Sequence, residues 1–303
     1  MIDPVKIYRS LYRIRRFEEM VLENFPKGVF FGTTHTYLGQ EANAVGVLSN
    51  LQEGDIVFSN HRCHGHFLAY GGDPRSLFAE LMGKATGVCG GRGGSQHLHW
   101  RNFYSNGIQG GIVPIAAGMA LAEKLKNSGA VCTVFLGDGT LGEGVVYEAL
   151  NMTSLWKIPL LVILENNYIA QTTPIELSLA GSIPKRFEAF GIPVVELNTS
   201  DAQEIHSTAK GLFSSTRQES APRALVLHTH RFGSHSKGDD TRSAEEIALL
   251  RERHDPLKVQ SARLSQAECT EVEIQVRTEL EEAYSLALND PFPSQELSSR
   301  GQI

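Results

Sequence analysis

The chain has 303 residues, 41% of them hydrophobic and 20% charged, which is enough for one large or two small globular domains and excludes a disordered chain. Its net charge of -6 and pI near 6.0 argue against a nucleic acid or an anionic membrane as the main partner, because such partners require clustered Lys and Arg. Apolar runs such as IPLLVIL are far shorter than the roughly 20 residues that span a bilayer. The N-terminus lacks an apolar segment of signal-peptide length, so we expect a soluble, cytoplasmic protein.

The first predicted element is an amphipathic helix over residues 4–24, in which apolar residues recur every three or four positions from Ile7 to Val21. Pro26 and Gly28 are expected to end this helix. We take residues 1–30 as a helical arm at the N-terminus of a single domain that spans residues 1–303.

A glycine-rich stretch follows from Gly71 to Gly111 and contains GVCGGRGGSQH and SNGIQGG. This glycine content predicts loops that approach a ligand or another backbone closely, and no regular helix or strand. A flexible linker is the alternative. His97, Phe103 and Ile108 disfavour it, because they are interleaved where a linker would carry Ser and Lys.

From about residue 113 the pattern alternates between helices and short buried strands. The predicted helices cover residues 113–129 and 143–157, and the predicted strands cover residues 130–136, 159–165, 192–198 and 224–230. Apolar strands separated by helices are typical of an α/β fold with a parallel sheet and helices on both faces. The segment 260–303 is predicted to hold a C-terminal helix, over residues 268–290 on a solvated surface, and a tail.

The four cysteines are distributed over this pattern without paired metal-ligand spacing. They are Cys63, Cys89, Cys132 and Cys269. Reduced thiols that pack in the interior of a cytosolic enzyme fit this distribution better than a disulfide framework.

Polar residues follow two of the predicted strands directly. Asp138 lies between Gly137 and Gly139 after the strand 130–136, and Asn167 lies just past the strand 159–165. Because both side chains leave the same edge of a parallel sheet, we expect them to lie close together, where such folds bind their ligands.

This pair predicts a metal and phosphate site. A carboxylate, an amide oxygen and a nearby backbone carbonyl are the hard ligands that Mg²⁺ or Ca²⁺ prefers. The remaining coordination positions suit oxygens of a diphosphate, which Gly137 and Gly139 allow to approach the backbone, and the next helix directs its N-terminus there. Gly-Asp-Gly and Asn-Asn are each common turns, but their order around one helix and one strand favours the site over turns alone.

The Gly-Asp-Gly and double-Asn pattern is the thiamine diphosphate motif. In its details the chain resembles the alpha subunit of the decarboxylating component of 2-oxo acid dehydrogenase complexes, a family that includes pyruvate and acetoin dehydrogenases. The resemblance reaches to about residue 258. It is carried by IRRFEE (14–19), HTYLGQEANAVGV (35–47), HRCHGHFLAYGGDP (61–74), ELMGKATGVCGGRGGSQH (80–97), EALNMTSLWKIP (148–159) and HRFGSHSKGDD (230–240).

The resemblance implies specific roles for residues of this chain. Asp138, Asn167 and the backbone carbonyl of Ile169 would hold Mg²⁺, and His35 and His235 would act in catalysis at the substrate end of the cofactor. The implied cofactor-binding residues are His61, Arg62, Gly107, Gln109, Gly137, Asp138, Gly139, Thr140, Asn167, Arg231 and His235. Histidines near a reacting carbonyl make chemical sense because imidazole moves protons near neutral pH, although each could instead be a structural residue.

The resemblance also implies the reaction and the partners. Thiamine diphosphate would act on a 2-oxo acid or an acyloin, and the acyl group would pass to a lipoyl or another carrier. In this family the glutamate that activates the cofactor belongs to a separate pyrimidine-binding domain, and a chain with both domains needs roughly 500 residues. We therefore expect a beta-type partner chain, with the active site at the interface of an alpha-two beta-two assembly.

Two positions depart from the family pattern. Gln96 stands where relatives usually have Met, and Gln109 stands where they have an apolar residue, so the substrate and the acyl acceptor stay open. Two alternatives remain as well. One is the cofactor-binding half of a split transketolase, and the other is a catalytically silent scaffolding subunit.

Overall fold

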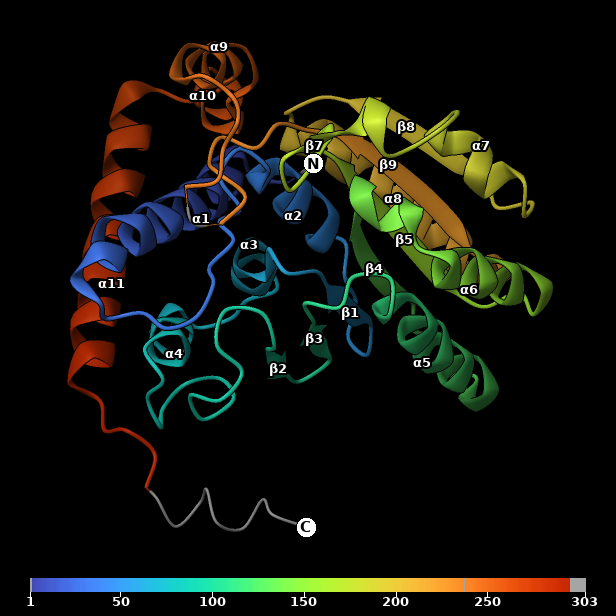
Figure 1. Cartoon of the computed structure of the whole chain (residues 1–303), viewed down its shortest axis with the longest axis horizontal. Coiled ribbons are helices and arrows are strands. Elements are labelled where there is room, and N and C mark those ends of the chain that lie inside the picture. Colours follow the sequence, from blue (N-terminus) through green and yellow to red (C-terminus); the bar gives the residue numbers. More distant parts are fainter. Residues whose placement is uncertain (1, 237, 295–303) are drawn as a thin grey trace.

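The computed structural model describes residues 2–236 and 238–294 (Figure 1). The α-helices are α1 (Pro4–Asn24), α2 (Glu41–Leu48), α3 (Cys63–Ala69), α4 (Pro74–Leu81), α5 (Ile112–Lys126), α6 (Gly144–Leu155), α7 (Ile183–Glu188), α8 (Ala202–Glu219), α9 (Ala244–His254), α10 (Pro256–Ser261) and α11 (Gln266–Asn289). Short 3-10 helices are η1 (Phe25–Lys27), η2 (Asp138–Gly142) and η3 (Ile175–Leu177). The strands are β1 (Ile56–Ser59), β2 (His99–Trp100), β3 (Phe103–Ser105), β4 (Cys132–Gly137), β5 (Leu160–Asn166), β6 (Ile169–Ala170), β7 (Thr173–Pro174), β8 (Val194–Asn198) and β9 (Arg223–His228).

Seven of the described strands form one sheet in the order β2-β3-β1-β4-β5-β9-β8. All neighbours pair in parallel except β2 and β3. The predicted α/β class with a parallel sheet is therefore confirmed, with one short antiparallel strand added at its edge.

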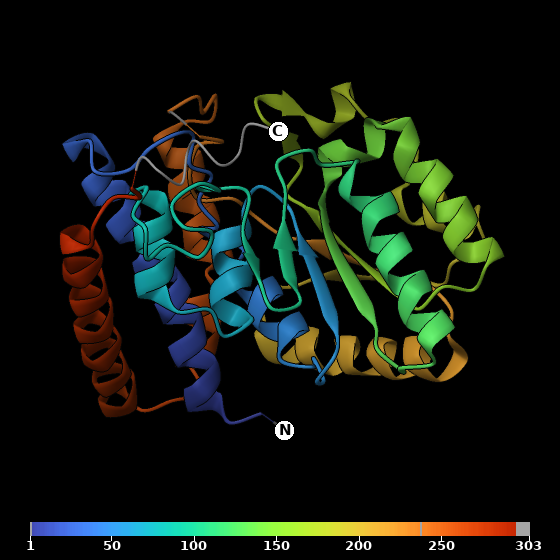
Figure 2. The same cartoon turned by 90° about the horizontal axis from the view of Figure 1, so that it is seen from below.

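Both faces of the sheet are buried, and the alternation along β4 shows why. Cys132, Val134 and Leu136 pack into one apolar cluster, whereas Phe135 packs into the other, because successive side chains of a strand point to opposite faces. The first cluster is covered by α5, α6 and α7, and the second by α1, α2, α3, α4, α8 and α11. Figure 2 shows α5 beside the sheet, with α8 crossing below the strands and α1 and α11 gathered at the other end of the molecule.

The glycine-rich stretch between Gly71 and Gly111 contains more regular structure than the sequence predicts. The quoted glycine-rich segments are mainly turns and loops, but residues 74–81 form α4, and residues 99–105 contribute β2 and β3. The expectation of no helix or strand in this stretch is wrong for these parts. Asp73 caps α4 by accepting the backbone N–H of Ser76 at 2.8 Å, which is a local signal for a helix start.

The C-terminal helix is also more buried than predicted. One face of α11, from Cys269 through Val276 to Ala287, packs against α1 and α4. Only its other face is solvated, so the expectation of a surface helix holds for half of it. The predicted tail from residue 295 to 303 lies outside the described residues.

The strand order places a ligand site. After β1 the chain adds β3 on one side of that strand, and then β4 on the other. The connections that leave the carboxyl ends of β1 and β4 thus run in opposite directions, toward β3 and β5. Such a topological switch point is where α/β sheets form their binding crevice. Among residues 2–236 and 238–294, no helix combines the length and apolar character needed to cross a membrane.

Candidate active site

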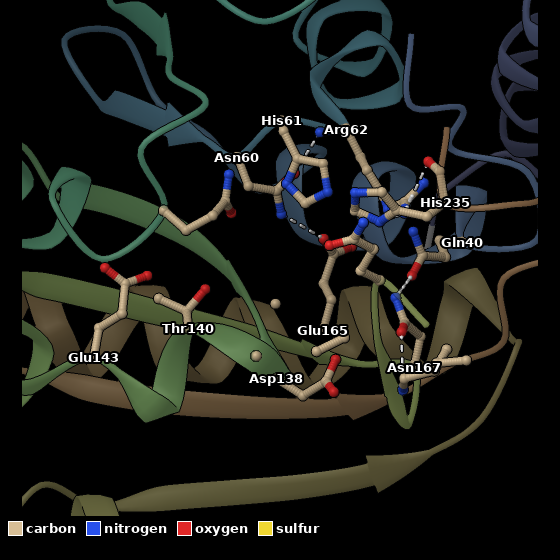
Figure 3. Close-up of a pocket in the computed structure, with 16 residues that line it drawn as sticks. Gln40, Asn60, His61, Arg62, Asp138, Thr140, Glu143, Glu165, Asn167 and His235 are labelled. Carbon is tan, nitrogen blue, oxygen red and sulfur yellow. Dashed lines mark hydrogen bonds between the residues drawn. The ribbon is translucent and has the colours of Figure 1, made fainter. Parts of the chain in front are cut away.

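A cavity of about 280 Å³ lies at this switch point (Figure 3). Its walls come from the segments that follow β1, β4 and β5, with additions from loops. The lining residues are Gln40, Asn60, His61, Arg62, Gln109, Gly137, Asp138, Gly139, Thr140, Glu143, Glu165, Asn167, Ile169, Ala170, Gln171 and His235. Of the predicted site residues, only His35, Gly107 and Arg231 are outside this wall.

Asp138 is a buried carboxylate with spare hydrogen-bonding capacity. It begins η2 directly after β4 and is only 3% exposed, and its Oδ2 has no hydrogen-bond partner among the described residues. Burial raises the pKa of this carboxyl group, although two backbone N–H groups oppose the effect. An isolated buried carboxylate is costly, so Asp138 is suited to bind a cation.

The turn after β5 brings two further oxygen donors to the same cavity. Tyr168 has a φ of 65°, in the left-handed region that non-glycine residues rarely adopt, and it separates Asn167 from Ile169. Because the chain reverses there, Asn167 and Ile169 both line the cavity together with Asp138. A carboxylate, an amide and a main-chain carbonyl are therefore available for a hard cation.

Two buried guanidinium groups lie beside this set. Arg62 is 4% exposed and donates to the carbonyl of Thr36 at 2.8 Å and to Nδ1 of His235 at 3.2 Å. Its pKa is lowered to about 9 by burial and then by Arg231. Arg231 is 1% exposed, and its Nε and one terminal nitrogen have no partner among the described residues. Neither cation has a hydrogen-bonded carboxylate there, so an anion in the cavity would stabilise both.

Gly137 at the end of β4 and Gly139 just after it place no side chain beside the position of that anion. A Cβ at Gly137 would meet no atom within 4 Å, and one at Gly139 would lie 2.8 Å from the Cβ of Ala170. Thr140 follows them on the cavity wall. The donor set of carboxylate, two guanidinium groups and a glycine turn fits a metal-bound diphosphate.

Three histidines gather at the other side of the cavity. Ring centroids of His35 and His61 lie 4.6 Å apart, as do those of His35 and His235. Burial, followed by the charge of Arg62, lowers the pKa of His35 to about 3 and that of His235 to about 4. The same two causes lower the pKa of His61 well below its usual value. All three imidazoles are therefore neutral near pH 7.

Neighbouring donors fix the tautomers of two of these rings. The guanidinium of Arg62 can only donate, so Nδ1 of His235 accepts and its proton is on Nε2. The amide nitrogen of Gln96 donates to Nδ1 of His35 at 3.1 Å, which gives His35 the same tautomer. The three histidine ligand atoms lie within 4.8 Å of one another, yet the protonated Nε2 atoms and the nearby Arg62 charge disfavour a metal between them.

Gln96 and Gln109, which the sequence analysis singled out, both lie in this region. Gln96 contacts His35 and also lies against Gly107, where a Cβ would lie 2.2 Å from the Gln96 Oε1. Gln109 lines the cavity, donates to the carbonyl of Gly107 at 3.3 Å, and has a buried Oε1 without a partner among the described residues. Both side chains therefore add polar groups to the side of the cavity that carries the histidines.

Sequence reasoning missed several lining residues: Gln40, Asn60, Glu143, Glu165, Ala170 and Gln171. Glu165 carried a signal, because it is an acidic residue at the end of an otherwise apolar strand. It accepts hydrogen bonds from Tyr37 and from Asn43 at 3.1 Å. Burial alone would raise the pKa of Glu165, but His66 and these donors more than offset that effect and the pKa is lowered. Glu165 is thus an ionised group beneath the cavity.

We expect His35 to make folding sensitive to acid. Its folded-state pKa of about 3 lies below the ordinary value of 6.5, so the unfolded chain binds a proton that the folded chain excludes. The stability that neutral His35 provides is present above pH 6.5 and is lost as the pH falls. Between pH 7 and pH 5 the wild type should lose about 1 kcal/mol more unfolding free energy than His35→Gln, after allowance for solvent that reaches the cavity.

Urea denaturation of both proteins at the two pH values measures this difference. Equal losses in wild type and His35→Gln would contradict the assigned environment of the imidazole.

Comparisons with known proteins agree with the geometry. The model of the dehydrogenase E1 component family matches residues 9–296. The chain is 38% identical to the pyruvate dehydrogenase E1 component subunit alpha of Zymomonas mobilis, with 97% of this chain and 86% of that protein covered. It is 36% identical to the protein of that name from Rickettsia felis, with 97% and 93% covered. It is also 35% identical to the testis-specific mitochondrial form from Rattus norvegicus, with 96% and 77% covered.

Proposed function

The chain belongs to the dehydrogenase E1 component family, and from that premise we propose that it is the alpha subunit of a thiamine diphosphate- and Mg²⁺-dependent 2-oxo acid dehydrogenase. In this role it decarboxylates a 2-oxo acid or cleaves an acyloin. The acyl group then passes to an acceptor such as a lipoyl carrier. This subunit acts with a beta-type partner chain.

One observation carries the proposal. A single cavity combines Asp138, a buried carboxylate with a free oxygen, and Arg62, a buried guanidinium whose hydrogen bonds within the described residues go to Thr36 and His235 and to no carboxylate. A cation alone would neutralise the carboxylate of Asp138 but repel the guanidinium of Arg62. An anion alone would have the opposite effect on each group. A metal-bound diphosphate satisfies both.

The residues divide into two groups in this proposal. Asp138, Asn167 and the carbonyl of Ile169 hold the Mg²⁺. The second group binds the rest of the cofactor and consists of His61, Arg62, Gly107, Gln109, Gly137, Gly139, Thr140, Arg231 and His235. Arg231 would act through its two unpartnered nitrogens from just behind the cavity wall.

The reaction itself depends on thiamine diphosphate, which supplies the nucleophilic carbon and the electron sink for cleavage next to a carbonyl. The protein supplies proton donors and orientation. His235 and His35 each carry a proton on Nε2 and stay neutral at pH 7, so they donate hydrogen bonds to substrate oxygens without adding positive charge.

A partner chain is supported by the family to which the chain belongs. The described elements build one sheet with its helices, and in the family the glutamate that activates the pyrimidine ring belongs to a separate domain. We therefore propose an alpha-two beta-two assembly with shared active sites. A cytoplasmic location belongs to the same proposal and is supported by four free cysteines.

The two alternatives receive less support. A split transketolase is disfavoured by the family match over residues 9–296. In a catalytically silent scaffold the unpaired polar groups of Asp138 and Arg231 would have no ligand to bind, and their burial would only destabilise the fold.

Native mass spectrometry of the complex purified gently from the chain's own cells tests the proposal. We expect two copies of this chain, two of a companion of similar size, and two equivalents of thiamine diphosphate. A chain that comes out alone and stays free of cofactor when Mg²⁺ and thiamine diphosphate are added would favour the scaffold.

A further inference from the structure

We propose that Gln40 couples the two halves of this site: its Oε1 orients the metal ligand Asn167, and its Nε2 donates a hydrogen bond to the diphosphate. This inference rests on the proposed function and adds to it a binding residue that the motif does not contain.

The backbone of Gln40 is held rigidly. Gly39 before it has a φ of +92°, and a Cβ there would lie 2.2 Å from the carbonyl oxygen of His230. Glu41 after it is buried, accepts the N–H of Gly39 at 3.0 Å and pairs with Arg15 at 2.6 Å. Gln40 itself is 1% exposed, so its side chain enters the cavity from a fixed position.

The oxygen of the Gln40 amide sets the orientation of Asn167. Nδ2 of Asn167 donates to Oε1 of Gln40 at 3.1 Å, as the dashed line in Figure 3 marks. If the Asn167 amide were rotated by half a turn, its Oδ1 would face Oε1 of Gln40 and the two acceptors would repel each other. Because this contact engages the nitrogen of Asn167, its Oδ1 remains for a cation, with only a long hydrogen bond from the N–H of Ile169 at 3.4 Å.

The nitrogen of the Gln40 amide has no such partner. Nε2 is buried and makes no hydrogen bond to the described residues, which is unfavourable for a polar group removed from water. An amide N–H cannot ligate a metal ion, so it requires an acceptor. Within the cavity that also contains Arg62, an oxygen of a bound diphosphate provides that acceptor.

Two substitutions separate the two contacts. Gln40→Met keeps the length of the side chain and removes both the acceptor and the donor. Gln40→Glu keeps an acceptor for Asn167 but removes the donor and places a carboxylate beside the diphosphate. Gln52→Met, in an exposed loop, is the matched control.

Binding is measured on the full chain with its companion, by Mn²⁺ electron paramagnetic resonance and by calorimetric titration of inorganic diphosphate and of thiamine diphosphate with Mg²⁺. We expect Gln40→Met to weaken both Mn²⁺ and diphosphate at least about tenfold. Gln40→Glu should bind Mn²⁺ as tightly as wild type and diphosphate at least about tenfold more weakly. Gln52→Met should match wild type.

Unchanged Mn²⁺ affinity in Gln40→Met, or unchanged diphosphate affinity in Gln40→Glu, would overturn the inference. Wild-type protein that binds neither Mn²⁺ nor thiamine diphosphate would instead count against the proposed function. If Gln40→Met does not fold, the contrast between Gln40→Glu and wild type decides.

Discussion

Asp138→Ala should abolish Mg²⁺-dependent binding of thiamine diphosphate and leave the fold intact. Asp138 provides the only carboxylate of the proposed metal set, and loss of groups that merely support a ligand already costs 10–100-fold in affinity. We therefore expect a loss of more than about 100-fold. The fold should survive, because the residue begins the short 3-10 turn η2 between β4 and α6. Its buried carboxyl group also has a raised pKa, which marks an environment unfavourable to the charge.

Calorimetric titration with Mg²⁺ and thiamine diphosphate, together with a thermal unfolding curve, measures both parts of this prediction. Glu53→Ala removes an exposed carboxylate and serves as the control. Full cofactor binding by Asp138→Ala would refute the metal assignment, and an unfolded variant would refute the claim that the turn is independent of the core.

Glu80→Gln should unfold the glycine-rich loop of residues 87–97 and lower the free energy of unfolding of the protein strongly. Glu80 is 1% exposed on α4, and its carboxylate accepts four backbone N–H groups of that loop. The distances from the carboxylate oxygens are 2.6 Å to Cys89, 3.0 Å to Gly91, 2.6 Å to Gly93 and 3.1 Å to Gly94. A glutamine keeps one oxygen and turns an NH₂ group toward donors. Since hydrogen bonds to a charged group are worth about 1.5–3 kcal/mol each, we expect a loss of at least about 3 kcal/mol.

The loop effect should extend to the side of the cavity that carries the histidines. Ser95 and Gln96 follow the anchored glycines and contact His64 and His35. Hydrogen exchange over residues 87–97 and urea denaturation measure the change, with Glu53→Gln as the control. A stability loss below about 1 kcal/mol with unchanged exchange in the loop would show that Glu80 does not organise it.

The sequence by itself determined the elements whose signals are local. The helices predicted at residues 4–24, 113–129 and 143–157 appear as α1, α5 and α6, because the spacing of apolar residues and the Pro and Gly at helix ends act within a few turns. Asp138 and Asn167 could be placed together in advance, because consecutive parallel strands end at one edge of the sheet.

Only the tertiary structure decided which distant segments complete the site. Gln40 contacts Asn167 across 127 positions of the sequence. Glu80 has no feature in the sequence that distinguishes it from other helix residues, and only the folded chain brings the N–H of Cys89 to its carboxylate. Burial of α11 against α1 likewise depends on a partner surface at the opposite end of the chain. The polar contacts of Gln40 and Glu80 leave no periodic trace in the sequence, because a single polar side chain that satisfies a remote backbone or amide group has no local pattern to repeat.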